Sequence, residues 1–214
     1  MGIRKYKAVI FDLDGVLVST DRYHYLAWEC ITRELGIPFD EKLNNLLKGV
    51  SRMESLEIIL KSGKHILEEK EKIALAEKKN DLYRRCLEAL DSTSIEAGVV
   101  SILKHLKSMG IKIAVGSSSK NARYILDKTG LAPWFDAVVD GNDITQTKPH
   151  PEVFLKAAEL LGVVPAEALV VEDATAGIEA AHTGGFDSAA LGDACNSPLA
   201  GSRIDRLSGL FYAI

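Results

Sequence analysis

Two carboxylates spaced two residues apart follow a short apolar run in this chain. The run covers residues 8–11, and Asp12 and Asp14 come directly after it. Side chains alternate between the faces of a strand, so we expect these two carboxylates to point the same way. An unbroken apolar run is typical of a strand buried on both faces of a parallel sheet, and ligands bind beyond the carboxyl ends of such strands. The pair therefore predicts a site for a hard cation such as Mg²⁺.

Three further polar clusters follow apolar runs later in the chain. They are residues 116–121, which include Ser117, then Lys148-Pro149, then Glu172-Asp173. Each also has an ordinary structural interpretation, because serine and acidic residues cap helices and X-Pro pairs form turns. Four clusters that all follow predicted strands favour one shared site over four unrelated caps and turns.

The residue types in these clusters suit phosphoryl transfer. A carboxylate oxygen of Asp12 can attack phosphorus and form an acyl phosphate. Ser117 and backbone amides at the next helix start can hold the transferring group, and Lys148 can place a cation against its oxygens. Asp14 can protonate the leaving oxygen and later deprotonate the acceptor, provided that it is not tied up by the metal.

The same clusters supply the oxygen ligands that Mg²⁺ prefers. We expect Asp12 and Asp173 to contribute carboxylates and Asp14 its backbone carbonyl. The full predicted metal set is Asp12, Asp14, Glu172 and Asp173.

The remaining apolar segments predict the elements that must position these clusters. Strand-like runs cover residues 112–116, 137–140, 168–171 and 188–191, and segments with helical periodicity cover residues 99–109, 121–129, 151–161 and 176–183. Alternating strands and helices indicate an α/β fold, with a doubly wound parallel sheet of the Rossmann type.

One interval breaks this alternation. From about residue 21 to residue 91 the apolar residues recur at helical spacing, and no convincing strand is present. This pattern predicts a helical bundle inserted after the first strand. We therefore expect a core formed by residues 1–18 and 93–214 and an inserted helical cap formed by residues 19–92. The connectors at residues 18–20 and 92–94 are the expected hinges of this cap.

Composition limits the class of protein. The chain has 214 residues, of which 47% are apolar, and a formal net charge of −4, which is ordinary for a globular protein and argues against a nucleic-acid partner. The three cysteines, Cys30, Cys86 and Cys195, are far apart and indicate a reducing compartment, so we expect a cytoplasmic location. No signal peptide or long apolar segment precedes the first strand, and we expect no membrane association.

The four clusters resemble the four motifs of the haloacid dehalogenase superfamily. The matching residues are Phe11-Asp12-Leu13-Asp14-Gly15, Ser117, Lys148-Pro149 and Glu172-Asp173. The helical insert after the first strand is similar to the smaller cap type of that superfamily. The resemblance implies that Asp12 is the nucleophile and Asp14 the general acid/base. Because most members are phosphatases, these motifs alone do not specify the reaction.

Stretches of the insert resemble the β-phosphoglucomutase family more closely. They are residues 20–28, 49–56 and 79–83, together with Ser119-Lys120-Asn121 in the core. The resemblance implies that the phosphate that is not being transferred is held by Arg52, Ser119, Lys120 and Asn121. It implies that Gly49 and Val50 line the sugar site, and that Thr20, His24 and Lys79 link cap closure to the general acid/base. Ser118 replaces a smaller residue common in that family, and its backbone amide could serve unchanged.

The activity of that family is the interconversion of β-D-glucose 1-phosphate and D-glucose 6-phosphate, through an aspartyl-phosphate enzyme and β-glucose 1,6-bisphosphate. The alternative is a Mg²⁺-dependent sugar-phosphate phosphatase, in which water takes the phosphoryl group. A binding protein without turnover is disfavoured, since pure binding needs no nucleophile. We expect Mg²⁺ as cofactor, a small sugar phosphate as the only partner, and a monomer. By the same resemblance, we expect a cis peptide bond at Lys148-Pro149. The segment after residue 192 matches no motif.

Overall fold

The computed structural model describes residues 6–212 and residue 214, so residues 1–5, which lead into the first predicted strand, lie outside the described part. The strands are β1 (Ala8–Phe11), β2 (Lys112–Gly116), β3 (Ala137–Val139), β4 (Ala168–Glu172), β5 (Asp187–Ala190) and β6 (Ser202–Arg203). The α-helices are α1 (Asp21–Glu34), α2 (Glu41–Asn45), α3 (Arg52–Gly63), α4 (Glu69–Leu87), α5 (Val99–Ser108), α6 (Ala122–Thr129), α7 (Glu152–Leu161) and α8 (Thr175–Thr183). Short 3₁₀ helices are η1 (Ser92–Ser94), η2 (Ala132–Trp134), η3 (Pro165–Glu167), η4 (Gly192–Asn196) and η5 (Leu207–Tyr212).

The six strands form one parallel sheet in the order β3-β2-β1-β4-β5-β6. This arrangement confirms the predicted α/β fold, and β1 lies between β2 and β4 as expected for a doubly wound sheet. The predicted strands and helices of the core are all present, with bounds that differ by at most one residue. The edge strand β6 was not predicted, because two polar residues carry no recognisable strand pattern.

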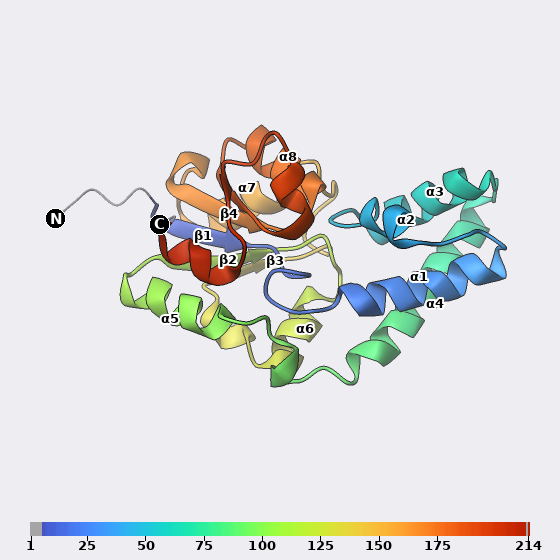
Figure 1. Cartoon of the computed structure of the whole chain (residues 1–214), viewed down its shortest axis with the longest axis horizontal. Helices are drawn as coiled ribbons and strands as arrows, with labels where there is room; N and C mark the ends of the chain where they lie inside the picture. Colours follow the sequence, from blue (N-terminus) through green and yellow to red (C-terminus); the bar gives the residue numbers. More distant parts are fainter. Residues whose placement is uncertain (1–5, 213) are drawn as a thin grey trace.

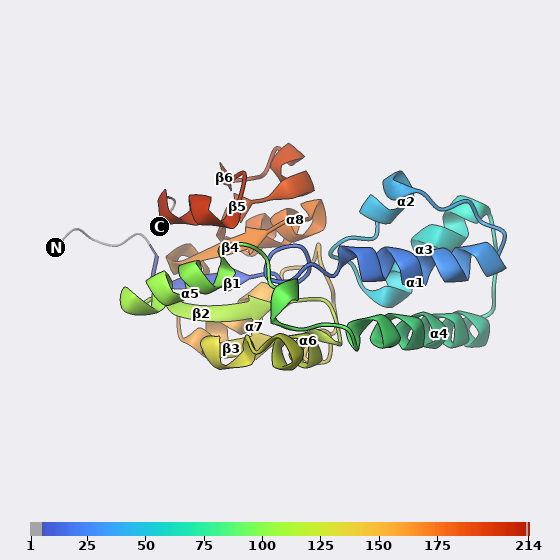
Figure 2. The same cartoon turned by 60° about the horizontal axis from the view of Figure 1, so that its bottom comes forward.

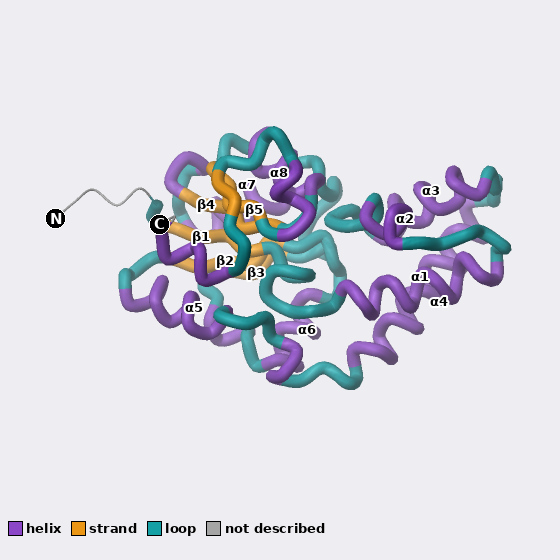
Figure 3. The backbone as a smooth tube through the Cα atoms, viewed as in Figure 1, coloured by secondary structure: helices purple, strands orange, loops and turns teal. Residues whose placement is uncertain are grey.

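Helices cover both faces of the sheet (Figure 3). The side chains of β1 alternate between these two faces and are all buried. Val9 and Phe11 pack with α5 and α6 in one buried cluster, whereas Ala8 and Ile10 pack with α7 and α8 in another. Because both faces of β1 are buried, its side chains must be apolar throughout, which explains the unbroken run in the sequence.

Helices α1 to α4 form a separate lobe beyond the carboxyl ends of the strands (Figures 1 and 2). This lobe has a buried apolar cluster of its own, which includes Trp28, Ile31, Leu56, Ile59 and Leu60. The start of α3 is fixed by a capping box, in which Ser51 accepts from the amide of Glu54 and Glu54 accepts from the amide of Ser51. Such reciprocal bonds satisfy two otherwise unpaired amides and set where the helix begins.

Two adjacent segments connect the lobe to the sheet. Val18 and Ile95 form an isolated antiparallel bridge, and the amide of Ser19 donates to the carbonyl of Ser94 at 3.0 Å. The predicted loop at residues 92–94 is one turn of 3₁₀ helix, capped by Asp91. Movement of the lobe about these connectors stays a prediction.

In the described part of the chain, none of the helices combines the length and the apolar character needed to cross a bilayer.

Candidate active site

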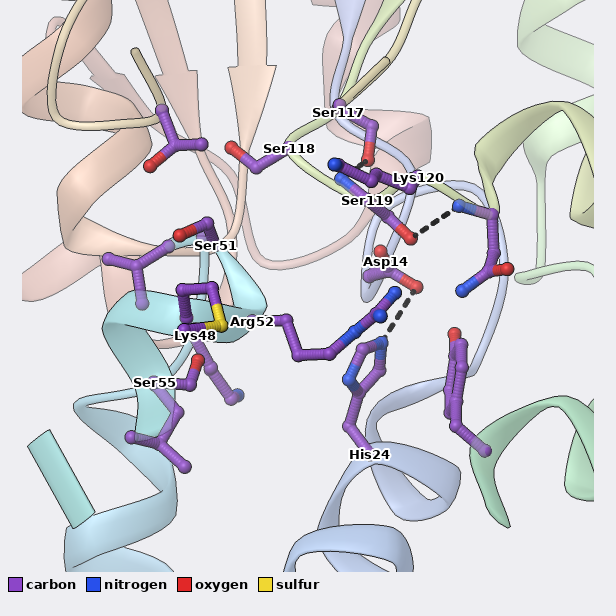
Figure 4. Close-up of a pocket in the computed structure, with 18 of the residues that line it drawn as sticks. Asp14, His24, Lys48, Ser51, Arg52, Ser55, Ser117, Ser118, Ser119 and Lys120 are labelled. Carbon is purple, nitrogen blue, oxygen red and sulfur yellow. Dashed lines mark hydrogen bonds and ion pairs between the residues drawn. The ribbon is translucent and has the colours of Figure 1, made fainter. Parts of the chain in front are cut away.

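A cavity of about 330 Å³ lies between the carboxyl ends of the strands and the helical lobe. Most of the predicted site residues line it: Asp12, Asp14, His24, Gly49, Val50, Arg52, Lys79, Ser117, Ser118, Ser119, Lys120, Asn121 and Asp173. Thr20, Lys148 and Glu172 do not line it but lie directly behind residues of its wall, as described below. Figure 4 shows that the core serines and the residues of the lobe face one another across this space.

Lys148 and Asp12 form a buried pair at the floor of the cavity. The Lys148 side chain is fully buried, and its ammonium group donates to Asp12 and, at 2.5 Å, to Oε1 of Glu172. Burial opposes the charge of Lys148, but the two carboxylates outweigh it and raise the pKa of the amine, which stays protonated. The peptide bond between Lys148 and Pro149 is cis, as expected.

Burial also governs Asp12. It raises the pKa of that carboxyl well above its usual value, the charge of Lys148 opposes this, and Glu172 and Asp14 reinforce it. Three acids near one lysine leave an excess of buried negative charge, which is costly unless a cation neutralises it.

The acidic cluster has the donor chemistry of a divalent-cation site. One oxygen each from Asp12, Glu172 and Asp173 lie within 4.8 Å of one another. Gly15 makes room for this cluster, because a Cβ there would lie 2.3 Å from Oδ2 of Asp173. Both oxygens of Glu172 already accept hydrogen bonds, from Lys148 and from the amide of Ala174 at 2.9 Å. The carboxylates of Asp12 and Asp173 are therefore the more available ligands, and the oxygen-only donor set fits Mg²⁺.

Asp14 faces away from that acidic cluster and toward the lobe. β1 ends at Phe11. The amide of Asp12 still donates to the carbonyl of Val171 in β4 at 2.9 Å, so Asp12 directly continues the strand, whereas Asp14 lies in the turn that follows. Thr20 donates to Oδ1 of Asp14, and Nε2 of His24 lies 3.8 Å from the same oxygen. Burial raises the pKa of Asp14 to about 6, against the opposing hydrogen bond from Thr20. A carboxyl with a pKa near neutrality can both give and take a proton.

His24 and Lys79 continue this arrangement into the lobe. The ammonium of Lys79 lies 2.9 Å from Nδ1 of His24 and 4.6 Å from the centre of the Tyr83 ring. Burial, with added repulsion from Lys79 and Arg52, lowers the pKa of His24 well below its usual value. A neutral imidazole that accepts at Nδ1 carries its proton on Nε2, which is the nitrogen that faces Asp14.

Lys79 predicts a characteristic dependence of stability on pH. Burial and the charge of Arg52 lower the pKa of this amine to about 7, although Asp14 opposes them. Between pH 7 and the unfolded value near 10, the unfolded chain holds one more proton, so the free energy of unfolding should rise with pH by up to about 1.4 kcal/mol per unit. Denaturant titrations at pH 7, 8, 9 and 10 measure this slope. The Lys79→Met variant should lose it, and an equal slope in both proteins would contradict the assignment.

Arg52 and two polar residues of the core form a second group that could hold an anion in the same cavity. Arg52 extends from the first turn of α3 toward His24 and Asp14 (Figure 4). Within the described residues it makes no hydrogen bond or ion pair, so its guanidinium is available to an anionic ligand. Lys120 and Ser119 face it from the core. Asn121 is held by Asn80 of α4, whose Oδ1 accepts from Nδ2 of Asn121 at 3.0 Å.

The core loop that carries these residues is itself braced. Ser117 is buried, and its hydroxyl accepts from the amide of Ser119 at 3.1 Å. Gly141 packs so closely against the loop that a Cβ would lie 2.4 Å from the carbonyl of Ser118. A larger residue at position 141 would push the loop away from the cavity.

Several residues that shape the cavity were not identified from the sequence. Tyr83 and Trp28 are buried aromatic residues whose rings lie beneath the ammonium of Lys79. Lys48, Asp21 and Thr147 also line the cavity. Aromatic residues at helical spacing indicate a helical core, and only the tertiary arrangement shows that these two rings hold Lys79.

Comparisons with known proteins agree with this geometry. The sequence pattern of the haloacid dehalogenase-like hydrolases matches residues 6–185. The chain is 42% identical to a β-phosphoglucomutase of Bacillus subtilis, over 87% of this chain and 83% of the relative. It is 34% identical to a phosphorylated carbohydrates phosphatase of Thermotoga maritima, over 85% and 82% of the two chains. The crystal structure of β-phosphoglucomutase from Clostridium difficile superimposes with a TM-score of 0.91, at 40% identity, over 96% of this chain and 93% of the other.

Proposed function

The chain belongs to the haloacid dehalogenase-like hydrolases, and on that premise we propose that it is a β-phosphoglucomutase. It interconverts β-D-glucose 1-phosphate and D-glucose 6-phosphate, and acts as an intramolecular phosphotransferase with β-glucose 1,6-bisphosphate as its intermediate. The enzyme is soluble and cytoplasmic, works as a monomer, and takes Mg²⁺ as its cofactor.

One observation supports this assignment: a single cavity is lined by two groups of residues that could each bind a phosphate, and we call these groups the two stations. The first consists of Asp12 and Ser117, with Lys148 behind them. The second consists of Arg52, Ser119 and Lys120. A monophosphate phosphatase needs only the first station, whereas a mutase must hold both ends of a bisphosphate. Arginine suits the second station because its planar guanidinium binds phosphate through two parallel hydrogen bonds.

At the first station, the carboxylate of Asp12 attacks phosphorus and the sugar oxygen leaves. Lys148 holds Asp12 in place and offsets negative charge on the equatorial oxygens. Asp14 gives its proton to the leaving oxygen, and in the reverse direction it removes the proton from the attacking hydroxyl. Mg²⁺ when bound supplies a positive charge against the phosphoryl oxygens, and the carboxylates of Asp12 and Asp173 with the carbonyl of Asp14 would hold it.

The lobe formed by α1 to α4 acts as a cap over this chemistry, with residues 19–92 as its extent. Closure brings His24 and Lys79 to Asp14 and covers the aspartyl phosphate, which water would otherwise hydrolyse. Opening lets the bisphosphate exchange its two ends between the stations.

A coupled assay tests the activity. The enzyme with Mg²⁺ and a trace of bisphosphate is given the β or the α anomer of glucose 1-phosphate, and glucose 6-phosphate and free phosphate are both measured. Formation of glucose 6-phosphate from the β anomer alone, with little free phosphate, is the expected result. Release of phosphate without glucose 6-phosphate would instead assign a phosphatase activity, like that named for the Thermotoga relative.

Arg52 provides a prediction that separates the two stations. Arg52→Ala should lower the mutase rate constant kcat/KM by about 10-fold to 100-fold, since a charge-assisted hydrogen bond contributes about 1.5–3 kcal/mol. Hydrolysis of a small monophosphate such as acetyl phosphate, which has no second phosphate, should change little. Steady-state kinetics on both substrates measure the difference. Equal losses on both would show that Arg52 supports the fold or the first station instead.

A further inference from the structure

Lys48 bridges the helical lobe and the core at the edge of the cavity. It lies in the loop between α2 and α3, directly before Gly49. Its ammonium is 3.0 Å from Oδ2 of Asp21, 3.4 Å from Oδ2 of Asp193 and 4.0 Å from Oδ2 of Asp173. The Lys48 side chain is only 22% exposed. The ammonium of Lys48 therefore lies near three carboxylates, of which those of Asp173 and Asp193 belong to the core.

Asp193 lies in η4, in the segment after residue 192 that matches no sequence motif. Its carboxylate is joined to Lys48 across 145 residues of sequence. Asp21, by contrast, is the first residue of α1 and belongs to the same lobe as Lys48. Opening of the cap would therefore keep the Lys48–Asp21 pair and break the Lys48–Asp193 pair.

A second contact between lobe and core lies at the other end of the same loop. Glu54, in the first turn of α3, accepts a hydrogen bond from the hydroxyl of Thr147. Thr147 directly precedes Lys148, whose ammonium donates to Asp12. Burial tends to raise the pKa of Glu54, but the hydrogen bonds from Thr147 and Ser51 outweigh it and lower that pKa, so the carboxyl accepts as an anion.

Between these contacts the loop lies close against the core. Gly49 has a φ of +77°, and a Cβ there would lie 3.3 Å from the Cβ of Ala174, just before α8. The segment from Lys48 to Glu54 covers the end of this loop and the first turn of α3, and we call it the substrate loop. It includes Gly49, Val50 and Arg52, which are the residues assigned to the sugar and the second phosphate. Contacts at both ends of this segment therefore fix the position and the orientation of these residues over the cavity.

We propose that the Lys48–Asp193 ion pair and the Glu54–Thr147 hydrogen bond together form a two-point clamp that holds the substrate loop on the core. Asp193 and Thr147 are then positioning residues that favour phosphoryl transfer to the sugar over hydrolysis. This inference rests on the proposed function, because it concerns the contacts that hold the proposed active site in its closed state. An ion pair and a hydrogen bond that form only on closure prolong the closed state, and the closed state excludes water from the aspartyl phosphate.

The test uses the full chain with substitutions on the core side of each contact. Asp193→Asn removes the charge that faces Lys48, and Thr147→Val removes one hydroxyl at nearly constant volume. Asp205→Asn is the matched control, since Asp205 is an exposed acid of the same tail and forms no ion pair among the described residues. Thr147→Ser keeps a hydroxyl at this position and should behave like the wild type.

Two readouts are measured for each variant. The first is the ratio of free phosphate released to glucose 6-phosphate formed at saturating β-glucose 1-phosphate. This ratio should rise about threefold for Asp193→Asn and by a similar factor for Thr147→Val, because both contacts are open to solvent. The second is the decrease in radius of gyration, by small-angle scattering, when Mg²⁺, fluoride and glucose 6-phosphate are added. The decrease should be smaller in both variants and smallest in the double variant.

An unchanged product ratio and unchanged compaction in the double variant would overturn the clamp. A uniform loss of both products together with a lower unfolding midpoint would also overturn it, because that result means a structural role only. If the wild-type enzyme forms no glucose 6-phosphate at all, the proposed function fails, and the scattering measurement still decides whether these contacts hold the closed state.

Discussion

The Asp12→Asn variant should lose all measurable turnover in both directions. An amide is a far poorer nucleophile than a carboxylate, and the neighbouring acids of the cluster have other partners or roles. The Asp14 carboxylate accepts from Thr20, both oxygens of Glu172 accept hydrogen bonds, and Asp173 is assigned to the metal. We expect the loss to reach the detection limit, at least about 10⁴-fold, since removal of a covalent nucleophile leaves only binding and electrostatic effects.

The fold should survive this substitution. Burial and the neighbouring acids raise the pKa of Asp12, so a neutral side chain of the same shape removes repulsion from the acidic cluster while Lys148 keeps its contact with Glu172. Thermal unfolding should therefore give a midpoint close to that of the wild type. Mass spectrometry after incubation with acetyl phosphate measures the phosphoenzyme directly. An aspartyl phosphate that still forms in Asp12→Asn would place the nucleophile elsewhere.

The sequence predicted which core residues line the cavity, because those residues follow buried strands. β1 is recognisable from its unbroken apolar run, because both of its faces are buried, with Val9 and Phe11 on one and Ala8 and Ile10 on the other. Once the strand is recognised, the residues after it must lie at one edge of the sheet. By contrast, β6 consists of Ser202 and Arg203 and is a strand only because β5 pairs with it.

The contacts of the site were harder to predict than its members. The sequence analysis places Glu172 with Asp173 among the metal ligands. In the structure, both carboxylate oxygens of Glu172 accept hydrogen bonds, one from Lys148 and one from the amide of Ala174. Its place as a metal ligand stays a prediction. The pairing of Lys48 with Asp193 joins an insert to a tail that has no motif, and no local pattern predicts contacts over such a separation.

Asp14→Asn should reduce kcat by about 10²-fold to 10⁴-fold, the usual contribution of a general acid/base. The amide can still receive the hydrogen bond from Thr20, so the local structure should persist. What it cannot do is move a proton to or from the sugar oxygen. Stopped-flow measurement of phosphoryl transfer from the enzyme to glucose 1-phosphate gives the affected step directly.

The substrate used to load the enzyme separates Asp14 from Asp12. Acetyl phosphate has a leaving group that departs without a proton, so Asp14→Asn should still form the aspartyl phosphate at a rate near that of the wild type, whereas Asp12→Asn should not form it. The loaded Asp14→Asn enzyme should then persist, because transfer to a sugar hydroxyl requires removal of its proton. The raised pKa of Asp14, about 6, also predicts that the wild-type transfer step slows as pH falls below that value, and that this dependence disappears in Asp14→Asn. Rapid decay of the loaded variant on addition of glucose 1-phosphate would show that another group, with His24 as the nearest candidate, takes the proton instead.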